Sequence, residues 1–538
     1  MAYHLDSPFD HVDPLSEGSF TWQRLFIHRD DFPLISGEGR RVCVVGGGIS
    51  GLVAAYELQR RDFRVTVIEA LDRCGGRIST HYFPDGSYGE LGAMRIPVMH
   101  AAAIDYVDEF DLPTRPFIYT NPAGRFYFNG VAGTIGRPSV SASGAVFDCY
   151  SALRKAFPDL DRVTTTHLEG GPRKLLMELL VNPLQAEISN DAVKWALFLS
   201  ASNGGIIDEF RTTRLVDYGH ALGLSGDDWE FLSRATGIAC LEECSVAQFI
   251  LDMFPTIMSS SMVEIVGGME LLPAAFVRHL RGERVLTAST VDRVELCDSG
   301  ASVCWQEKDA TKFREVFDFV VLAIPPIALR NVTLVSSSMD RSKDEAIRRT
   351  EMGPLAKTLI RFNERFWEQE PSSIYGGLSF TNLESQQCWY PSDNGRGFHD
   401  LTGRVSYRAV HPDNVYGPGV LTASYRWGSG ARQFSRLSDG ERTSRALSDL
   451  ALIHDMDMAK ISSLVDGEVH KFWPGGFTIL DNNDYHRDLG LPLLDHASTR
   501  RVFFAGEHVG AVHGWLISAI VSALSAVREI LSTAATRK

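Results

Sequence analysis

Long hydrophobic runs and a secretion signal are both absent from the sequence. The first residues, MAYHLDSPFDHVDPL, contain no basic start followed by an apolar core, so they do not match a secretory signal. The apolar stretch GWLISAIVSALSAV, which begins at Gly514, is too short to span a bilayer, and we expect a buried helix there. These absences predict a cytoplasmic protein that has no membrane partner.

The chain has few cysteines and an excess of acidic over basic residues. The eight cysteines match no disulfide framework, and only Cys240 and Cys244 lie close together, without a second pair at zinc-like spacing. We therefore expect free thiols and no metal. The 67 acidic residues outnumber the 53 basic ones and give a net charge of −14, which repels phosphate backbones. Nucleic acid is therefore not an expected partner.

The chain contains no low-complexity tract and no internal repeat. Its 538 residues are too many for one simple core, so we expect two or three packed domains. Residues 40–45, RRVCVV, and 64–68, RVTVI, are apolar, β-rich runs, and a helix is expected from Ile49 to about Arg61. A strand, a helix and a strand in this order form one βαβ unit.

A glycine-rich turn, Gly46-Gly47-Gly48-Ile49-Ser50-Gly51, lies between the first strand and the helix. In this G-x-G-x-x-G pattern Gly46 allows the tight turn, Gly48 lets the backbone approach a pyrophosphate, and Gly51 lets the helix lie close to the strand. The start of the helix then presents free N–H groups to the phosphates. Alone the motif is a weak signal, because glycine turns also occur without a ligand.

Two features that follow the turn strengthen this interpretation. Glu69 ends the second strand about 20 residues beyond the turn, where a carboxylate accepts hydrogen bonds from a ribose. Directly after it comes Arg73-Cys74-Gly75-Gly76-Arg77, in which the glycines permit close backbone contact and Arg77 is able to pair with a phosphate. A solvated surface arginine is the alternative for Arg77. Together these features predict a bound dinucleotide and favour FAD over NAD.

The segment GGGISGLVAAYELQRRDFRVTVIEALDRCGGR resembles the opening of the flavin amine oxidase family, which includes monoamine oxidases, polyamine oxidases and L-amino acid oxidases. Later segments match in the family's order: IVGGMELLPAAF from Ile265, the strand around Val291, DFVVLAIPP, and FFAGEH, which ends in Glu507 and His508. The resemblance covers most of the chain, and covers the helical insert and the N-terminus least. It implies an FAD-dependent oxidoreductase.

The resemblance also implies which residues hold the FAD. In relatives the carboxylate at the position of Glu507 meets the ribityl chain, whereas an acid that favours a helix start is the alternative for this residue alone. No cysteine follows the last flavin motif, where covalent monoamine oxidases attach their flavin, so we expect non-covalent FAD. The expected cofactor contacts are Gly46, Gly48, Ile49, Ser50, Gly51, Glu69, Ala70, Arg73, Gly76, Arg77, Gly92, Ala93, Met94, Arg95, Val291, Gly506, Glu507, Gly514, Trp515 and Leu516.

The segment LGAMRIP, residues 91–97, narrows the expected substrate. It resembles the G-x-M-R-[LF]-P element of amino-acid oxidases and amino-acid monooxygenases, in which the arginine holds the substrate carboxylate. The resemblance therefore assigns this role to Arg95. The chemistry agrees, because a planar guanidinium makes two parallel hydrogen bonds to a carboxylate. A structural arginine paired with an internal acid is the alternative.

Further catalytic positions are also assigned by resemblance. Tyr390, in CWYPSDNG, resembles the tyrosine that is the second carboxylate donor, although Trp389 beside it is an alternative alignment. Gly514 and Trp515 lie in the family's H-G-W or G-G-W element, where the glycine carbonyl faces the substrate amine and the indole lines the site. Lys357 interrupts an apolar strand pattern, and the family lysine there holds a water near flavin N5. Core aromatics and an exposed lysine are the respective alternatives.

The expected fold class is α/β, with a Rossmann-like FAD-binding domain, an α+β substrate domain and a helical insert. Residues 1–38 are expected to be an N-terminal extension packed on the substrate domain. The FAD-binding domain is predicted to comprise 39–80, 268–345 and 491–538, the substrate domain 81–135, 254–267 and 346–490, and the helical domain 136–253.

The expected reaction is oxidative deamination of an L-amino acid by dioxygen to a 2-oxo acid, ammonia and hydrogen peroxide, catalysed by a homodimer. An amino-acid 2-monooxygenase, which would release carbon dioxide and an amide, shares the same motifs. Arg95 argues against a polyamine oxidase or a desaturase, and the set of Lys357, Arg95 and Trp515 argues against a flavin-stabilised scaffold. The preferred side chain is not predicted, although Trp389, Trp473, Phe477 and Trp515 are candidate lining residues.

Overall fold

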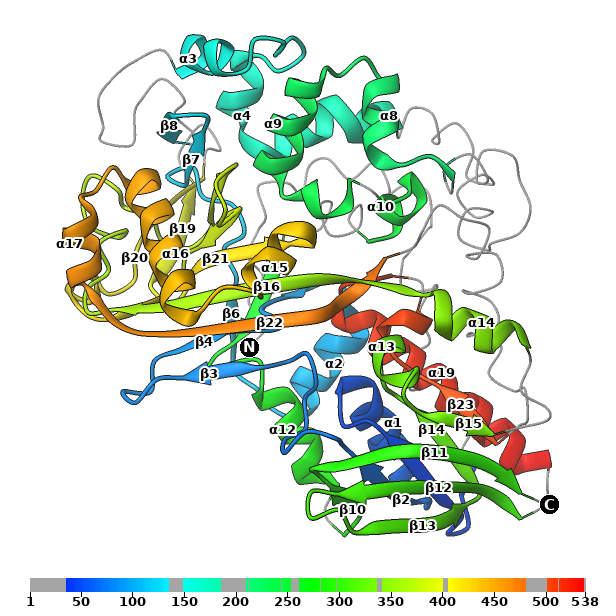
Figure 1. Cartoon of the computed structure of the whole chain (residues 1–538). Helices are drawn as coiled ribbons and strands as arrows, with labels where there is room; N and C mark the ends of the chain where they lie inside the picture. Colours follow the sequence, from blue (N-terminus) through cyan, green and yellow to red (C-terminus); the bar gives the residue numbers. More distant parts are fainter. Residues whose placement is uncertain are drawn as a thin grey trace.

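The computed structural model describes residues 35–134, 149–184, 210, 212–242, 244–252, 261–280, 282–297, 299–335, 341–399, 405–479, 501–510 and 512–536. Figure 1 shows these residues as three tiers. A nucleotide-type α/β unit lies at the bottom of the view, a sheet with two long strands crosses the middle, and a group of helices lies at the top.

The bottom tier is built around a five-stranded parallel sheet in the order β10-β2-β1-β14-β23. Its strands are β1 (Arg41–Val45), β2 (Arg64–Ile68), β10 (Arg284–Leu286), β14 (Phe319–Leu322) and β23 (Val502–Phe504). Strands β1, β2 and β14 are almost continuously buried, as apolar runs covered on both faces must be. Helix α1 (Ile49–Gln59) joins β1 to β2 and confirms the predicted βαβ unit.

The C-terminal helix α19 (Leu516–Thr536) packs against α1 and against α2 (Ala101–Glu109). With 21 residues and a mean hydropathy of 1.5, it is long and apolar enough to cross a membrane. Its apolar positions are instead mostly buried inside the protein, so the prediction of a buried helix is confirmed. The argument from length was wrong, because the helix extends beyond the apolar stretch to Thr536.

A second sheet of four strands, in the order β13-β12-β11-β15, completes the bottom tier. It consists of β11 (Ser289–Cys297), β12 (Gly300–Glu307), β13 (Lys312–Phe317) and β15 (Thr333–Val335). Strands β11 and β12 form the antiparallel hairpin that the alternation over 285–307 predicted. The same stretch of the chain also contains the helices α12 (Leu271–His279), α13 (Pro326–Leu329) and α14 (Arg341–Arg349).

The middle tier is a seven-stranded sheet in the order β22-β16-β21-β18-β17-β7-β8. Its strands are β7 (Arg125–Phe128), β8 (Val131–Thr134), β16 (Glu351–Phe362), β17 (Leu378–Thr381), β18 (Gln387–Trp389), β21 (Gly419–Trp427) and β22 (Val465–Ile479). The long strands β16 and β22 run side by side across Figure 1. Around this sheet lie β3 (Thr80–Tyr82), β4 (Tyr88–Glu90), β5 (Ile96–Pro97), β6 (Thr114–Pro116), β9 (Met262–Ile265), β19 (Gly395–His399), β20 (Val405–Ala409), α15 (Gly428–Phe434), α16 (Asp439–His454) and α17 (Met458–Ser463).

The top tier contains the described part of the predicted helical domain. Its helices are α3 (Cys149–Ala156), α4 (Thr165–Leu176), α8 (Leu215–Ala221), α9 (Gly226–Thr236) and α10 (Val246–Asp252). Helix α9 begins with a capping box, in which the Ser225 side chain and the Asp228 side chain accept each other's backbone N–H. The predicted boundaries at 135/136, 253/254 and 490/491 lie outside the described residues, as does almost all of the predicted N-terminal extension.

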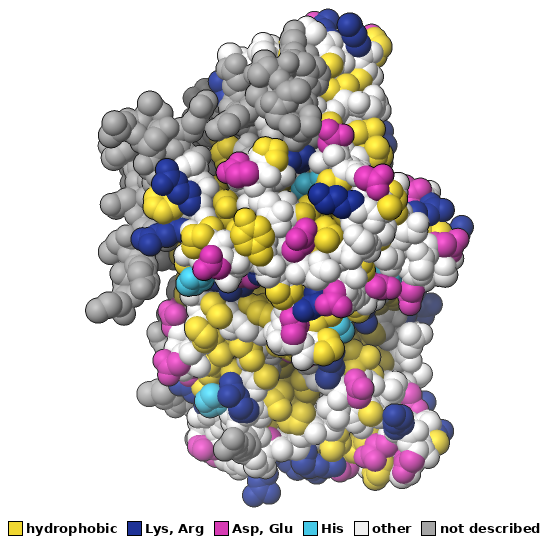
Figure 2. Space-filling view, turned by 90° about the vertical axis from the view of Figure 1, so that its left-hand side faces the viewer, with side chains coloured by type: hydrophobic (Ala, Val, Ile, Leu, Met, Phe, Trp, Pro, Cys, Tyr) yellow, Lys and Arg dark blue, Asp and Glu magenta, His cyan; other side chains and the backbone are white. Residues whose placement is uncertain are grey.

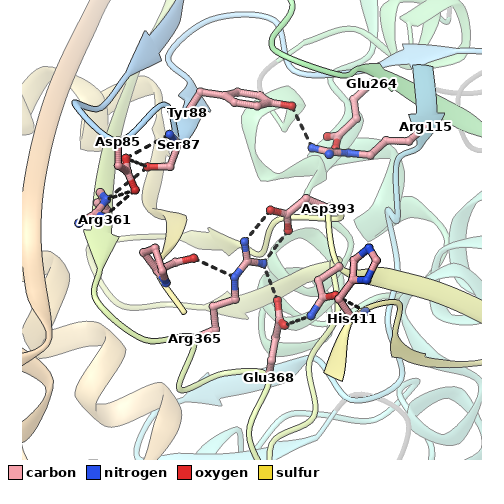
Figure 3. Close-up of polar contacts among 12 residues, drawn as sticks. Asp85, Ser87, Tyr88, Arg115, Glu264, Arg361, Arg365, Glu368, Asp393 and His411 are labelled. Carbon is pink, nitrogen blue, oxygen red and sulfur yellow. Dashed lines mark hydrogen bonds and ion pairs between the residues drawn. The ribbon is translucent and has the colours of Figure 1, made fainter. Parts of the chain in front are cut away.

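Ion pairs join strand β16 and the residues that follow it to neighbouring segments (Figure 3). Arg361 pairs with Asp85 in the turn between β3 and β4, at 2.7 Å. Arg365 makes a two-pronged pair with Asp393, at 2.6 and 2.7 Å, and also contacts Glu368. On the face shown in Figure 2, basic and acidic side chains are interspersed and hydrophobic ones gather in the lower half. The net negative charge is therefore not concentrated on that face.

Candidate active site

The glycine turn after β1 has the geometry that its sequence predicts. Gly46 has a positive φ of 106°, and a Cβ there would lie 2.6 Å from the carbonyl oxygen of Ala323. A Cβ at Gly51 would collide with the carbonyl of Gly46. Gly48 differs, because nothing lies within 4 Å of the position that its Cβ would take. The first and last glycines are thus required by the turn, and the middle one leaves the backbone open to a ligand.

Glu69 lies beside this turn at the end of β2. One carboxylate oxygen, Oε2, accepts from the N–H of Gly47 at 2.6 Å, and the other accepts from the N–H of Leu71 at 2.8 Å. The side chain is buried and held in one position. Each oxygen keeps a lone pair, so the predicted contact with a ribose remains compatible with this arrangement.

The loop after Glu69 is held by its own arginines. Arg73 donates to the carbonyl oxygens of Cys74, Gly76 and Ile78, at 3.2, 3.1 and 3.0 Å. Arg77 donates through Nη1 to the carbonyl of Gly476 at 3.0 Å and to Glu507 at 3.1 Å. Arg77 is therefore not a solvated surface residue. The phosphate contact of Arg77 and the cofactor contact of Arg73 stay predictions.

Glu507 joins three segments of the chain. Its carboxylate accepts four hydrogen bonds: from the N–H and the hydroxyl of Thr478, at 2.8 and 3.0 Å, from the N–H of Gly514 at 2.9 Å, and from Arg77. Burial opposes its ionisation, but the charges of Arg77 and His513 and these N–H donors lower the pKa of Glu507 to about 2. The predicted ribityl contact would have to replace one of these bonds, because a carboxylate has about four acceptor positions.

His508, which the sequence interpretation left without a role, is a candidate for contact with the cofactor. It is buried, and neither ring nitrogen has a hydrogen-bond partner within the described part of the chain. Burial lowers the pKa of His508 to about 3, so the imidazole is neutral and offers one donor and one acceptor. Buried polar groups are normally satisfied, and a polar ligand at this edge of the sheet would supply the missing partners.

Arg95 lies half-buried among four aromatic rings. Its guanidinium carbon is 4.8 Å from the ring centroid of Trp389, 5.1 Å from that of Tyr119, and 5.5 Å from those of Phe117 and Trp515. Within the described residues it makes no ion pair, and its Nε is buried without a partner. The alternative of an arginine paired with an internal acid therefore finds no support. A cation in such surroundings favours the binding of an anion.

The structure contradicts the predicted role of Tyr390 beside Arg95. Its hydroxyl is buried and hydrogen-bonded to Ser379 at 2.7 Å and to His454 at 2.8 Å. The neighbouring ring, Trp389, is the one that lies over Arg95. Successive residues at the end of β18 face opposite sides of the sheet, so Trp389, the alternative in the alignment, is the residue that faces Arg95, and its role as a carboxylate donor stays a prediction. The indole N–H of Trp389 is bonded to Gln387 at 2.9 Å.

Tyr119 and Tyr425 supply phenols near Arg95 that the sequence interpretation missed. The ring of Tyr119 packs edge-to-face on Trp389, with centroids 5.3 Å apart. Burial raises the pKa of Tyr119, although the charge of Arg95 opposes part of this shift. Burial likewise raises the pKa of Tyr425, again against the charge of Arg95. Both hydroxyls are therefore protonated donors at neutral pH. No motif surrounds Tyr119 in FIYTNPAG, so only the fold reveals its position.

Lys357 is fully buried in β16, so the alternative of an exposed lysine is wrong. Its Nζ donates to the carbonyl oxygens of Glu90 at 3.1 Å and Gly92 at 2.7 Å, and lies 3.6 Å from Sδ of Met94. It also lies 4.6 Å from the ring centroid of Tyr425. Burial lowers the pKa of this ammonium to about 7, although the negative charge of Glu90 acts to raise it. Two of its three hydrogens are bonded to carbonyls and the third to the Met94 thioether, which is only a weak acceptor that a water or a ligand would have to replace.

The residues before α19 connect the flavin motif to the surroundings of Arg95. Gly514 has a positive φ of 78°, and its N–H is bonded to Glu507. The ring of Trp515 lies between Arg95 and His100, whose ring centroid is 5.5 Å from that of Trp515. The predicted substrate residues Arg95, Lys357, Gly514 and Trp515 are thus brought together, whereas Tyr390 is not.

The other predicted residues are distributed between these two regions. The indole N–H of Trp473 is bonded to the carbonyl of Leu91 at 2.8 Å, and Phe477 packs on Trp427. The N–H of Ala93 is bonded to the carbonyl of Arg77 at 3.1 Å. Val291 is buried in β11. Around the glycine turn, Gly46, Gly48, Ile49, Ser50, Gly51, Glu69, Ala70, Arg73, Gly76 and Arg77 lie on adjoining loops and on the start of α1.

Known proteins match this chain along most of its length. The family model described as flavin-containing amine oxidoreductase matches residues 49–531. The protein YobN of Bacillus subtilis (strain 168), provisionally named an L-amino-acid oxidase, is 28% identical over 501 residues, which cover 91% of this chain and 94% of YobN. The L-amino-acid oxidase of Siganus canaliculatus is 27% identical over 513 residues, which cover 93% of this chain and 87% of that protein.

Solved structures share the fold. Cyclohexylamine oxidase from Brevibacterium oxydans IH-35A superposes with a TM-score of 0.64 at 17% identity, covering 93% of this chain and 99% of that one. Putrescine oxidase with bound putrescine superposes with a TM-score of 0.61 at 20% identity, covering 93% and 98%. These likenesses confirm the predicted α/β fold class.

Proposed function

Since the chain belongs to the family of flavin-containing amine oxidoreductases, we propose that this flavin-dependent oxidoreductase is an oxidase of L-amino acids. The observation that carries the proposal is Arg95, a guanidinium enclosed by four aromatic rings that makes no ion pair within the described residues. An amine without a carboxylate would leave this charge uncompensated. The L-amino-acid oxidase names of the two relatives agree with the proposal.

We propose that the FAD is held without a covalent bond by the glycine turn, Glu69 and the loop through Arg77. The open position at Gly48 and the unpartnered imidazole of His508 fit such a group. The N-terminus of α1 favours the phosphates through its N–H groups. Bound FAD would supply the two-electron oxidation of the substrate and the subsequent reaction with dioxygen.

The protein's own contribution is mainly to bind and orient the amino acid. Arg95 receives the carboxylate as a charge-assisted pair, and the Tyr119 hydroxyl donates a further hydrogen bond to it. Trp389 and Trp515 pack beside the guanidinium and exclude water, which strengthens both interactions. A carboxylate fixed in this way positions the α-carbon, and such orientation contributes several kcal/mol to catalysis.

Lys357 supplies a second positive charge near this position. Its ammonium is held by the Glu90 and Gly92 carbonyls, and its third hydrogen, which is bonded to the weak thioether acceptor of Met94, would turn to a water when one is bound. A fixed cation favours negative charge as it develops on oxygen during its reduction. We therefore propose that Lys357 assists the step with dioxygen.

A peroxide assay under air with each of the twenty amino acids, in both L and D forms, tests the proposal. We expect peroxide, ammonia and a 2-oxo acid in equal amounts from at least one L-amino acid and none from its D form. Release of carbon dioxide and an amide would assign the chain to the 2-monooxygenases. Peroxide from simple amines alone would overturn the proposal.

A further inference from the structure

The Lys357 ammonium reaches Glu90 at the end of β4. Lys357 Nζ donates to the backbone carbonyl of Glu90 at 3.1 Å, so the carboxylate of the same residue lies within one glutamate side-chain length of this contact. That carboxylate accepts from the N–H of Met269 at 2.8 Å and from the Thr80 hydroxyl at 3.0 Å. It is therefore held in one position, although it makes no direct ion pair with Lys357.

Each of these two groups influences the ionisation of the other. Burial raises the pKa of Glu90 to about 7, although the Met269 N–H, the Thr80 hydroxyl and the charge of Lys357 each act to lower it. Burial lowers the pKa of Lys357 to about 7, and Glu90 opposes this shift while Arg95 adds to it. The charged form of each side chain is thus favoured by the charged form of the other.

The charged and titratable groups around the pair come from several elements. The groups that face Lys357 are Glu90, Arg95, and the two residues that pair with it in the sheet, Tyr425 on β21 and Lys471 on β22. The groups that face Glu90 are Lys357, Glu264, Tyr82 and Tyr88. Lys471 places its own ammonium 4.7 Å from the ring centroid of Trp473. Among these described groups, Glu90 is the acid that faces Lys357.

We propose that Glu90 is a positioning residue whose carboxylate favours the charged form of the buried Lys357 ammonium, and thereby sets the pH range in which the lysine assists the reaction with dioxygen. The inference rests on the proposed role of Lys357. Glu90 acts through the lysine and contacts neither substrate nor oxygen. Removal of its charge should therefore change the pH dependence of one half-reaction and leave substrate binding unchanged.

Glu90→Gln keeps the shape and an acceptor oxygen for the Met269 N–H but removes the charge. In the wild type, reoxidation should slow as the pH rises through the pKa of Lys357, because the cation is lost. In Glu90→Gln the rate of reoxidation should fall at a pH about one unit or more below that of the wild type, because the negative charge that favours the Lys357 ammonium is missing. Stopped-flow absorbance of the reduced flavin mixed with oxygen, from pH 6 to 9, measures the profile.

Asp85→Asn is a matched control. Asp85 lies in the same β3–β4 hairpin, and it pairs with Arg361 on the same strand as Lys357 (Figure 3). This variant loses a link between hairpin and strand but keeps every charge that faces Lys357, so its pH profile should match the wild type. Glu90→Gln combined with Lys357→Met should behave like Lys357→Met alone. A uniform slowing at all pH values in Glu90→Gln would show a structural role and overturn the proposal.

Urea unfolding provides a readout that does not depend on activity. With Glu90 uncharged, the folded-state pKa of Lys357 lies still further below its unfolded value, so the unfolded chain binds more protons and stability rises with pH above that folded pKa. Between pH 6 and 9 the gain in stability of Glu90→Gln over the double variant should therefore begin at a lower pH than the gain of the wild type over Lys357→Met. The same onset in both comparisons would contradict the inference.

Thr80→Val tests the proposal if Glu90→Gln does not fold, because the Thr80 hydroxyl is bonded to the Glu90 carboxylate. The loss of the hydroxyl raises the pKa of Glu90, so the fall in reoxidation should move to lower pH, by less than in Glu90→Gln. An unchanged profile in a folded Thr80→Val would count against Glu90. If Lys357→Met itself left reoxidation unaltered, the proposed role of the lysine would fail instead, and the unfolding comparison would still report on the pair.

Discussion

Trp389 and Tyr390 are consecutive in the chain and their rings lie on opposite sides of the sheet. Trp389 packs 4.8 Å from the Arg95 guanidinium, whereas the Tyr390 hydroxyl is buried against Ser379 and His454. A phenol that packs on Arg95 therefore comes from Tyr119, on a separate segment, and not from the motif that marks the site in the sequence.

Substitution of the two tyrosines by phenylalanine should separate their roles. Tyr119→Phe removes a donor to the substrate carboxylate, so kcat/KM for amino acids should fall by roughly tenfold to a hundredfold, as expected for a hydrogen bond to a charged group of about 1.5–3 kcal/mol. Tyr390→Phe removes the partner of His454 Nε2 and one of the two hydrogen bonds of the Ser379 hydroxyl, and should lower the free energy of unfolding by about 1–3 kcal/mol with little change in KM. The reverse pattern would restore Tyr390 to the substrate site.

The flavin should be released as intact FAD when the purified protein is precipitated with acid. The glycine turn and Glu69 fit a dinucleotide, and no cysteine follows the last flavin motif. Chromatography of the supernatant against FAD and FMN standards checks the identity of the released flavin. Yellow colour that remains in the pellet would show a covalent link.

Arg95→Ala should retain FAD but lose transition-state stabilisation of about 2–4 kcal/mol in amino-acid oxidation, because a desolvated charge pair is broken. Arg95→Lys should recover part of this loss, since an ammonium cannot form the planar two-pronged contact. The rate of flavin bleaching under anaerobic conditions measures both variants. Wild-type rates in Arg95→Ala on every amino acid would remove Arg95 from substrate binding.

Lys357→Met keeps much of the side-chain length and removes the charge. We expect folding and FAD binding to survive, and reoxidation by dioxygen to slow more than reduction by the amino acid. The two half-reactions are followed separately by stopped-flow absorbance. If both half-reactions slowed equally, or if neither slowed, Lys357 would have only the structural role of binding the Glu90 and Gly92 carbonyls.

The features that could be predicted from the sequence depend on neighbours in the chain. The turn Gly46–Gly51 and the strands around it follow from local steric rules, so the motif and the fold it belongs to were both predicted correctly. Arg95 was found because its motif is contiguous. The predicted FAD contacts beyond the glycine turn rest on the family resemblance and stay predictions.

What the sequence could not supply depends on contacts between distant segments. A shift of one residue reverses the face of a strand, so Trp389 and Tyr390 were not distinguishable by pattern. Tyr119 carries no motif, and Lys357 meets Glu90 across 267 residues of chain. His508 became a candidate only when the structure placed both of its nitrogens in the interior without partners among the described residues.

The most direct test of carboxylate recognition compares one substrate with and without its carboxyl group. The best L-amino acid from the peroxide assay and the amine left by its decarboxylation are each mixed with the oxidised enzyme without oxygen, and bleaching of the flavin is followed. If Arg95 holds the carboxylate, the amino acid should bleach the wild type at least about a hundredfold faster than the amine, and Arg95→Ala should remove most of that difference. Equal bleaching of the wild type by the two compounds would contradict the account and assign the enzyme to the amine oxidases.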